Sequence, residues 1–306
     1  MKRLYLFICL TVVTFSVYAD YNDGLVYFKQ QQYKQAYQEF KQSADHGDVN
    51  GLTALAVMYQ KGLGVPKNLT LAARYTEKAA KRGNLAAQNN LANLYAVGLG
   101  LKQDYKKAFY WYSKAEKQGS AGAAYNLGLS YKNGDGVEKN YEKAFRWYQK
   151  AANEGYVLAY ASLGAFYYDG LGIEKNYEEA YKNFNKAKNY NIPRAFYGLG
   201  VMYANGNYVK QDSVKAINYF IDGANRNDDK SQYQLGKLYN EGKFVKPDMV
   251  ASYKWLTLSA NQGNADAKAL LPKVKAKLSN AQLQQAEQAV AEFKPIDQNP
   301  LMINQH

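Results

Sequence analysis

The chain repeats itself every 36 residues, and this period constrains the fold more than any other feature. One tyrosine marks each repeat, with a leucine four residues before it and a glycine three residues after it. The tyrosines are Tyr59, Tyr95, Tyr131, Tyr167, Tyr203 and Tyr239. A period of roughly 20 to 50 residues is typical of a solenoid, in which each unit buries its apolar face only against its neighbours.

Residues 85–120 show how one unit is built. Ala87, Leu91 and Tyr95 are spaced four residues apart, which places them on one face of a first helix. Glycines then interrupt the pattern, and Asp104 can cap a second helix that ends near Gly119. The other units have Asn68, Asn140, Asn176, Asp212 and Asp248 at the capping position. Each unit is therefore expected to be helix A, a loop, helix B and a short turn.

Small residues follow the leucine of helix A and recur near the start of helix B, so the two backbones can approach closely. Leucine, tyrosine and tryptophan are expected to fill the space between successive units. The loop glycines are expected to adopt positive φ. The second loop glycine is replaced by Tyr208 and Phe244 in the last two units, so those loops should differ in shape and expose two aromatic side chains.

This pattern resembles the Sel-one-like repeat family, which is related to the tetratricopeptide repeat. The resemblance rests on Ala123, Leu127, Gly128, Tyr131, Gly134, Gly136 and Val137, and on Ala144, Trp147, Ala151, Ala152 and Gly155. It covers six units over residues 49–264. It implies an all-α, right-handed α/α superhelical solenoid of helix-loop-helix repeats, tetratricopeptide-like in its packing. Because the motif residues pack the repeat, the resemblance is much less informative about function.

The segments outside the array are predicted to close its two ends. Residues 20–48 form a shorter, tetratricopeptide-like hairpin that caps the N-terminal side. Residues 265–294 form C-terminal capping helices, with Ser279 as the N-cap of the last one. Residues 295–306 are expected to be a flexible tail.

Residues 1–19 are typical of a signal peptide. Lys2 and Arg3 precede a short apolar run, and Ala19 offers a small residue for cleavage. Lipidation at Cys9 is rejected because the preceding residues are large. We therefore expect a periplasmic or secreted protein, cleaved after Ala19, with no remaining cysteine and no transmembrane segment.

The chain is basic, and the charge is uneven. Its net charge is +13, and loss of Lys2 and Arg3 leaves +11. A lysine recurs at the period of the repeat along helix B, as Lys78, Lys114, Lys150 and Lys186. This row is either an ordinary solvated helix face or a surface that attracts an acidic protein or the anionic envelope. Nucleic acid is not expected as a partner, because the chain has no nucleic-acid-binding motif.

The sequence offers no constellation for catalysis or cofactor binding. His46 and His306 are the only histidines, and their spacing cannot form a metal site. The loop glycines lack the remainder of a phosphate-binding fingerprint. Some cysteine-rich relatives are associated with β-lactam binding or hydrolysis, but this chain lacks their cysteines. We therefore expect no enzyme, no cofactor and no metal.

The leading hypothesis is a non-enzymatic scaffold or adaptor that binds a protein partner. The partner is expected to be acidic if the basic surface of this chain takes part in binding. The alternative is an immunity protein that neutralises a toxic lipase or wall hydrolase, and an enzyme is the third choice.

The resemblance implies that helix A lines the concave, partner-binding face. The expected contact residues are those of helix A that the packing motif leaves free: Asn89, Asn93, Tyr125, Leu129, Lys132, Ala161, Ala165, Tyr168, Tyr197, Val201, Tyr233, Lys237 and Asn240. The oligomeric state stays open.

Overall fold

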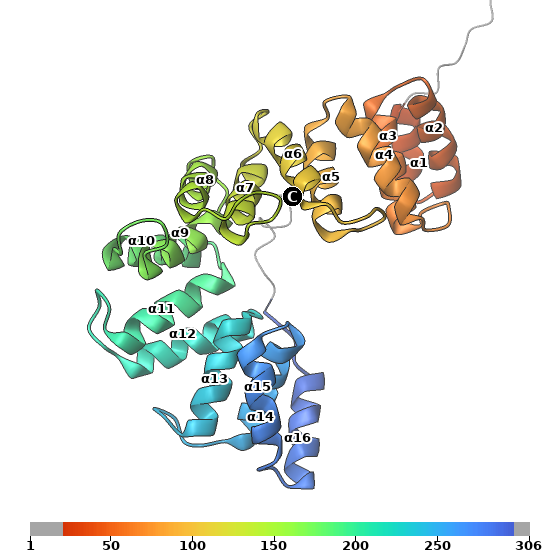
Figure 1. The fold of residues 1–306 in the computed structure, drawn as a ribbon. Helices are drawn as coiled ribbons and strands as arrows, with labels where there is room; N and C mark the ends of the chain where they lie inside the picture. The colour runs from red at the N-terminus through yellow and green to blue at the C-terminus, as the bar shows by residue number, and fades with distance from the viewer. Residues whose placement is uncertain (1–20, 297–306) are drawn as a thin grey trace, which may run out of the picture. The chain divides into compact units, whose positions relative to one another are not determined.

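The computed structural model describes residues 21–296, and every regular element in that range is an α-helix. The helices divide between two compact units, residues 1–104 and 105–306, each considered by itself (Figure 1). The expected signal peptide and most of the expected tail lie outside the described residues. Among residues 21–296, no helix combines the length and the apolar character needed to cross a membrane.

The first unit contains a short hairpin and the helices that follow it. These are α1 (Tyr21–Lys29), α2 (Tyr33–Asp45), α3 (Val49–Lys61), α4 (Leu69–Lys81) and α5 (Leu85–Val97). Phe40 of α2 is almost fully buried, and the Cβ of any residue replacing Gly24 would lie 2.5 Å from its ring. The glycine thus lets α1 pack closely on α2.

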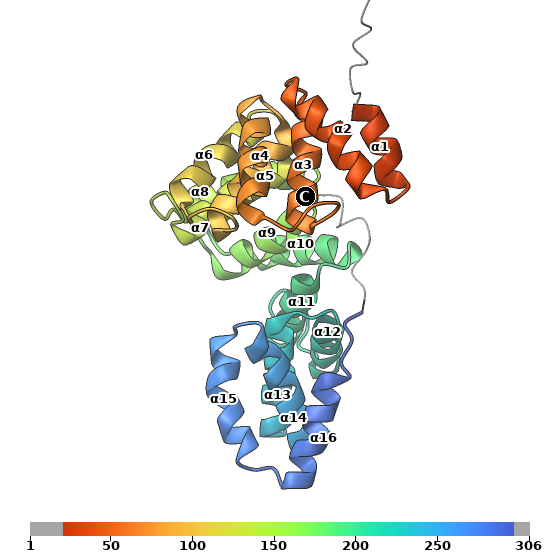
Figure 2. The ribbon, with the colours of Figure 1, turned by 90° about the vertical axis from the view of Figure 1, so that its right-hand side faces the viewer.

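The second unit continues the alternation of A and B helices. They are α6 (Tyr105–Glu116), α7 (Ala121–Asn133), α8 (Tyr141–Asn153), α9 (Leu158–Asp169), α10 (Tyr177–Asn189), α11 (Pro193–Asn205), α12 (Ser213–Asn225), α13 (Asp229–Glu241), α14 (Met249–Asn261), α15 (Ala265–Lys275) and α16 (Asn280–Ala291). From α6 to α15 each helix packs on the next, and the A helices α9, α11 and α13 also contact one another in turn. The last two helices both pack against α14 (Figure 2).

The expected caps form at both ends of the helices. Asn68, Asn140, Asn176, Asp212 and Asp248 each accept a hydrogen bond from the backbone N–H three residues on, at 2.9–3.0 Å. Ser279 caps α16 in a full capping box with Gln282. Helices α3, α5, α7, α9, α11 and α13 all end at a glycine with φ between 64° and 87°. These six capping residues and the αL glycines are thus confirmed, while the expected cap at Asp104 stays a prediction.

A ring from helix B packs against the glycine of helix A within one repeat. A Cβ added to Gly128 would lie 2.7 Å from the Tyr148 ring, and one added to Gly164 would lie 2.6 Å from the Phe184 ring. Gly200 and Phe220 repeat this arrangement. The missing side chain therefore makes room for a buried ring, as well as bringing the backbones close.

The six repeat tyrosines correct one expectation about the core. All six are half-buried rather than buried. The residue immediately before the tyrosine points inward instead, as with Met58, Phe166, Met202 and Leu238. A helix turns by about 100° per residue, so one position separates the core from its margin. The leucine four residues earlier is buried in every repeat, as expected.

Candidate protein-binding groove

Three adjoining pockets run along the A helices of the second unit. The first has a volume of about 630 Å³, the second about 190 Å³ and the third about 460 Å³. Ala165, Asp169, Arg194 and Lys230 line both the first and the second, while Tyr197 and Val201 line both the second and the third. We call the three pockets together the A-helix groove. It is formed by α7, α9, α11 and α13, with walls from α12 and the adjoining loops.

The structure brings most of the expected contact residues of this unit into the groove. They are Tyr125, Leu129, Lys132, Ala161, Ala165, Tyr168, Tyr197, Val201 and Lys237. Tyr168 is oriented by its hydroxyl, which donates to Asn207 at 2.9 Å and accepts from Asn205 at 3.0 Å. These residues therefore share one surface, and their contact with a partner stays a prediction.

The last repeat departs from the expected arrangement. Tyr233 packs against the apolar cluster of Tyr253 and Leu256, where α14, α15 and α16 cover it. Asn240 accepts a hydrogen bond from Lys277 at 2.8 Å. Lys230 and Gln234 line the groove here, alongside the expected Lys237. The terminal helices thus occupy the side of α13 that the repeat pattern alone assigns to a partner.

The two asparagines of the first unit lie in different surroundings. Asn93 lines a separate pocket of about 320 Å³, whose walls include Val57, Val97 and Leu99. Asn89 is only 8% exposed, and its side-chain oxygen is buried without a hydrogen-bond partner. Asn89 is therefore placed to support the helix packing, whereas Asn93 faces a hollow.

Positive charges from three repeats meet in the first pocket. Lys132 comes from α7, Arg194 from α11 and Lys230 from α13. Desolvation in the groove lowers the pKa of Lys132, and the positive charges of Lys230 and Arg194 lower it further. The Tyr197 ring lies beside two of these cations, 5.8 Å from Arg194 and 5.5 Å from Lys230. The same lining contains Asp169, Asp228 and Asp229, so the formal charges balance, and Lys132 and Lys230 are the cations without an ion pair among the described residues.

Arg194 is held in place by two carboxylates at the start of α13. Its Nε lies 3.0 Å from Asp228, and its Nη2 donates to Asp229 at 2.6 Å. Asp228 also caps α13, since it accepts from the backbone N–H and the hydroxyl of Ser231 at 2.7 and 2.8 Å. Burial raises the pKa of Asp228, and Arg194 and Ser231 oppose that rise.

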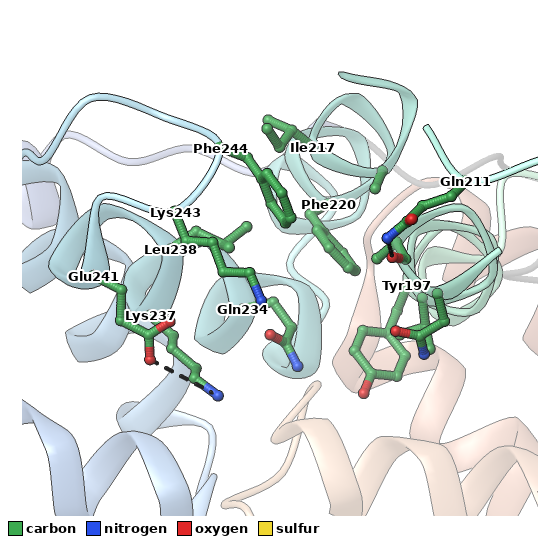
Figure 3. Close-up of a pocket in the computed structure, with 14 residues that line it drawn as sticks. Tyr197, Gln211, Ile217, Phe220, Gln234, Lys237, Leu238, Glu241, Lys243 and Phe244 are labelled. Carbon is green, nitrogen blue, oxygen red and sulfur yellow. Dashed lines mark hydrogen bonds and ion pairs between the residues drawn. The ribbon is translucent and has the colours of Figure 1, made fainter. Parts of the chain in front are cut away.

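The third pocket is bounded by an aromatic loop residue, and Figure 3 shows how its walls are arranged. Phe244 lies beside Ile217 and Phe220 on one side, while Tyr197 and Lys237 lie on the other. Phe244 is 50% exposed, so it offers apolar surface to solvent. This pocket pairs an apolar wall with a polar one, as protein-binding clefts commonly do.

The glycine loops of the earlier repeats leave no room for a side chain at the position that Phe244 occupies in the last repeat. At the equivalent Gly136, an added Cβ would collide with the carbonyl oxygen of Tyr105, which begins the preceding B helix. Gly64, Gly100 and Gly172 meet the same obstacle. Tyr208 and Phe244 keep the left-handed backbone, with φ of 64° and 67°, and both remain exposed. The expectation of two exposed aromatics is confirmed.

The lysines expected along helix B lie over aromatic rings. In the first unit, Lys78 lies 5.4 Å from the ring centre of Tyr75. In the second unit, Lys114, Lys150 and Lys186 lie 5.6, 5.7 and 4.6 Å from the ring centres of Tyr110, Trp147 and Tyr160. Lys150 also forms an ion pair with Glu116 on the neighbouring B helix, which neutralises part of this row.

Within residues 21–296, no group of three or more histidine, cysteine, aspartate and glutamate side chains could hold a metal ion. The groove instead offers hydrogen-bonding amides, tyrosine rings and lysines, which suit non-covalent recognition.

Sequence reasoning did not single out Arg194, Lys230 or Asp228. A usable signal was present, because Arg194 and Lys230 are 36 residues apart, at the second position of their A helices. Their convergence with Lys132 depends on how each repeat is rotated against the next, and the repeat period carries no information about that rotation.

Comparison with solved structures gives two informative neighbours. One is a Sel1 repeat protein from Oxalobacter formigenes, at 28% identity and a TM-score of 0.71, covering 78% of this chain and 96% of that one. The other is c5321, a protective antigen present in uropathogenic Escherichia coli strains and displaying an SLR fold, at 26% identity and a TM-score of 0.58, covering 88% of this chain and 67% of that one.

An immunity protein from Pseudomonas aeruginosa, Pa5087, is more distant, at 22% identity and a TM-score of 0.47 over 72% of this chain and 83% of that one. A comparison with the curated proteins gives no match. The first two neighbours confirm the expected all-α, tetratricopeptide-like solenoid. The Sel1 repeat model matches six consecutive segments, residues 49–84, 85–120, 121–156, 157–189, 193–228 and 229–264, and the chain therefore belongs to the Sel1 repeat family.

Proposed function

We propose that this chain is a non-enzymatic scaffold that binds a segment of a protein partner along the A-helix groove. The observation that carries the proposal is the continuity of the three pockets across four successive A helices. A groove of this kind can hold an extended segment, with tyrosine rings giving rigid contact area and amides bonding to its backbone. Membership of the Sel1 repeat family supports the proposal, because such repeats typically mediate protein–protein interaction.

The proposal places the protein in the periplasm or outside the cell, after cleavage at Ala19. Support comes from residues 1–19, with their basic start, apolar run and small residue before the cleavage point. N-terminal sequencing of the protein from a periplasmic fraction tests this part. Asp20 is the expected first residue, and an intact Met1 on a cytosolic protein would contradict it.

Site-specific photo-crosslinking tests the binding surface. A benzophenone amino acid at Tyr168 or Tyr197 in the groove is expected to capture the same partner from envelope extract. The matched control places the same group at Tyr110, an exposed aromatic on the B-helix side. Capture of that partner only from Tyr110 would contradict binding in the groove and would indicate that the partner binds the B-helix surface that carries the recurring lysines. The captured protein would also distinguish an adaptor from an immunity protein, since the latter would retain a toxic hydrolase.

A further inference from the structure

The first pocket of the groove contains two lysines without an ion pair in the described part of the chain and a guanidinium donor that its own packing leaves unused. We infer that it is an acceptor site for an acidic side chain of the partner, whose carboxylate binds between Lys132 and Lys230 and takes the free Nη1 of Arg194. This inference rests on the proposed function, and it names the chemistry that the partner must present at one point of the groove.

The donors that the site offers lack partners in the described part of the chain. Lys132 and Lys230 form no hydrogen bond or ion pair within residues 21–296. Nη1 of Arg194 is buried without a hydrogen-bond partner, although Nε and Nη2 of the same guanidinium are paired. A buried donor left unsatisfied costs free energy, which a bound carboxylate would recover.

A second unsatisfied group lies in the lining of the same pocket. The hydroxyl of Tyr148 is buried and has no partner among the described residues, and Tyr148 is fully buried as a residue. Two unpaired lysines, one unused donor of Arg194 and one unpaired hydroxyl thus line a single cavity of about 630 Å³, together with three carboxylates. Desolvation and the two neighbouring cations already lower the pKa of Lys132, and an approaching carboxylate would reverse that effect.

The acids in the lining decide between a carboxylate and a phosphate as the ligand group. Asp228 and Asp229 are both paired with Arg194, and Asp169 is exposed and forms no ion pair with either lysine. Because these three carboxylates offset the three cations, the lining is balanced in charge, and it accommodates the single negative charge of a carboxylate better than the two charges of a phosphate. The geometry therefore favours a glutamate or aspartate in an otherwise extended segment.

Fluorescence anisotropy with a labelled octaglutamate peptide tests the site directly, with labelled octaglutamine as the neutral counterpart. The full chain is expected to bind octaglutamate and not octaglutamine. In Lys132→Met/Lys230→Met the dissociation constant is expected to rise about tenfold or more, because both charge-assisted contacts to the carboxylate are lost. The matched control is Lys114→Met/Lys186→Met, which removes the same charge from the B-helix side and should leave the affinity unchanged.

Equal weakening in both double variants would overturn the inference, because it would mean that only net charge matters. Tighter binding of inorganic polyphosphate through the same two lysines would overturn the choice of carboxylate. NMR of ¹³C-methylated lysines adds a measurement independent of affinity: the pKa of Lys132 should rise when octaglutamate binds. If the crosslinked partner still binds Lys132→Met/Lys230→Met normally, the acceptor site fails while the proposed function stands. If crosslinking rejects the groove, the proposed function fails even where octaglutamate binds.

Discussion

Arg194 of α11 places its Nε 3.0 Å from the carboxylate of Asp228, the residue that caps the following A helix. The carboxylate is only 3% exposed, whereas the arginine side chain keeps 36% of its surface in solvent. The pair therefore lies at the margin of the protein interior, where removing one partner leaves the other charge largely desolvated.

Arg194→Met is expected to lower the free energy of unfolding by about 1–3 kcal/mol, because Asp228 loses its cation but keeps its bonds to Ser231. Urea unfolding followed by circular dichroism measures the change. Arg146→Met is the control, since Arg146 pairs with Glu142 on an exposed helix face and should contribute about 0.5 kcal/mol or less. If Asp228→Asn added to Arg194→Met restores nothing, the loss does not arise from the stranded carboxylate.

At neutral pH, the Lys132→Met variant is expected to be at least as stable as the natural protein in the absence of a partner. The pKa of Lys132 is lowered in the folded state, so between the folded and unfolded values the unfolded chain binds more protons. The stability of the natural protein relative to Lys132→Met should therefore rise as pH increases through the folded pKa towards about 10.4. Unfolding curves at pH 7 to 10.5 check the sign. A relative loss of stability over that range would place Lys132 next to an acid instead.

Substitution should destabilise the protein at a loop glycine and have little effect on stability at a loop aromatic. Gly136→Ala is expected to cost about 1–2 kcal/mol from its left-handed backbone alone, with a further cost from the collision with Tyr105. Phe244→Gly should change stability by less than about 1 kcal/mol, because the relief of strain is offset by the flexibility that glycine adds to the unfolded chain. Thermal unfolding measures both.

The same Phe244→Gly variant should bind the crosslinked partner more weakly, because the third pocket loses its apolar wall. Val97→Ala is the control, because it changes an exposed apolar residue in the other unit and should leave partner binding unchanged. Unchanged partner binding in Phe244→Gly would restrict the binding surface to the first two pockets.

Tyr131→Ala is expected to cost about 1–3 kcal/mol, below the range for a fully buried aromatic, because Tyr131 is half-buried against Phe109. Hydrogen exchange should quicken first around residues 121–156, since each repeat contacts only its neighbours. Tyr110→Ala is the exposed comparison and should change little. Uniformly faster exchange across the second unit would indicate that its repeats unfold together.

The local features of the fold could be predicted from the sequence because each depends on a few neighbouring residues. Asn140 caps α8 by accepting a hydrogen bond from the backbone N–H of Lys143, three residues on. Gly134 ends α7 because glycine readily adopts the left-handed backbone conformation. The half-buried position of Tyr131 could not be predicted as readily, because it depends on the exact rotation of α7 against α8. The packing of Tyr233 also depends on α15 and α16, two helices that lie beyond the repeats and do not follow their pattern.

The aromatic loops have a consequence for how this array can change its length. The first four repeats carry glycine at the second loop position, so each can seat its loop on whichever B helix precedes it. Tyr208 and Phe244 make the last two repeats specific to their places, because each needs a neighbour that leaves room for a ring. Duplication or deletion of whole repeats is therefore expected to be tolerated most readily within residues 49–192, whereas the sterics of the last two repeats restrict which unit can precede each of them.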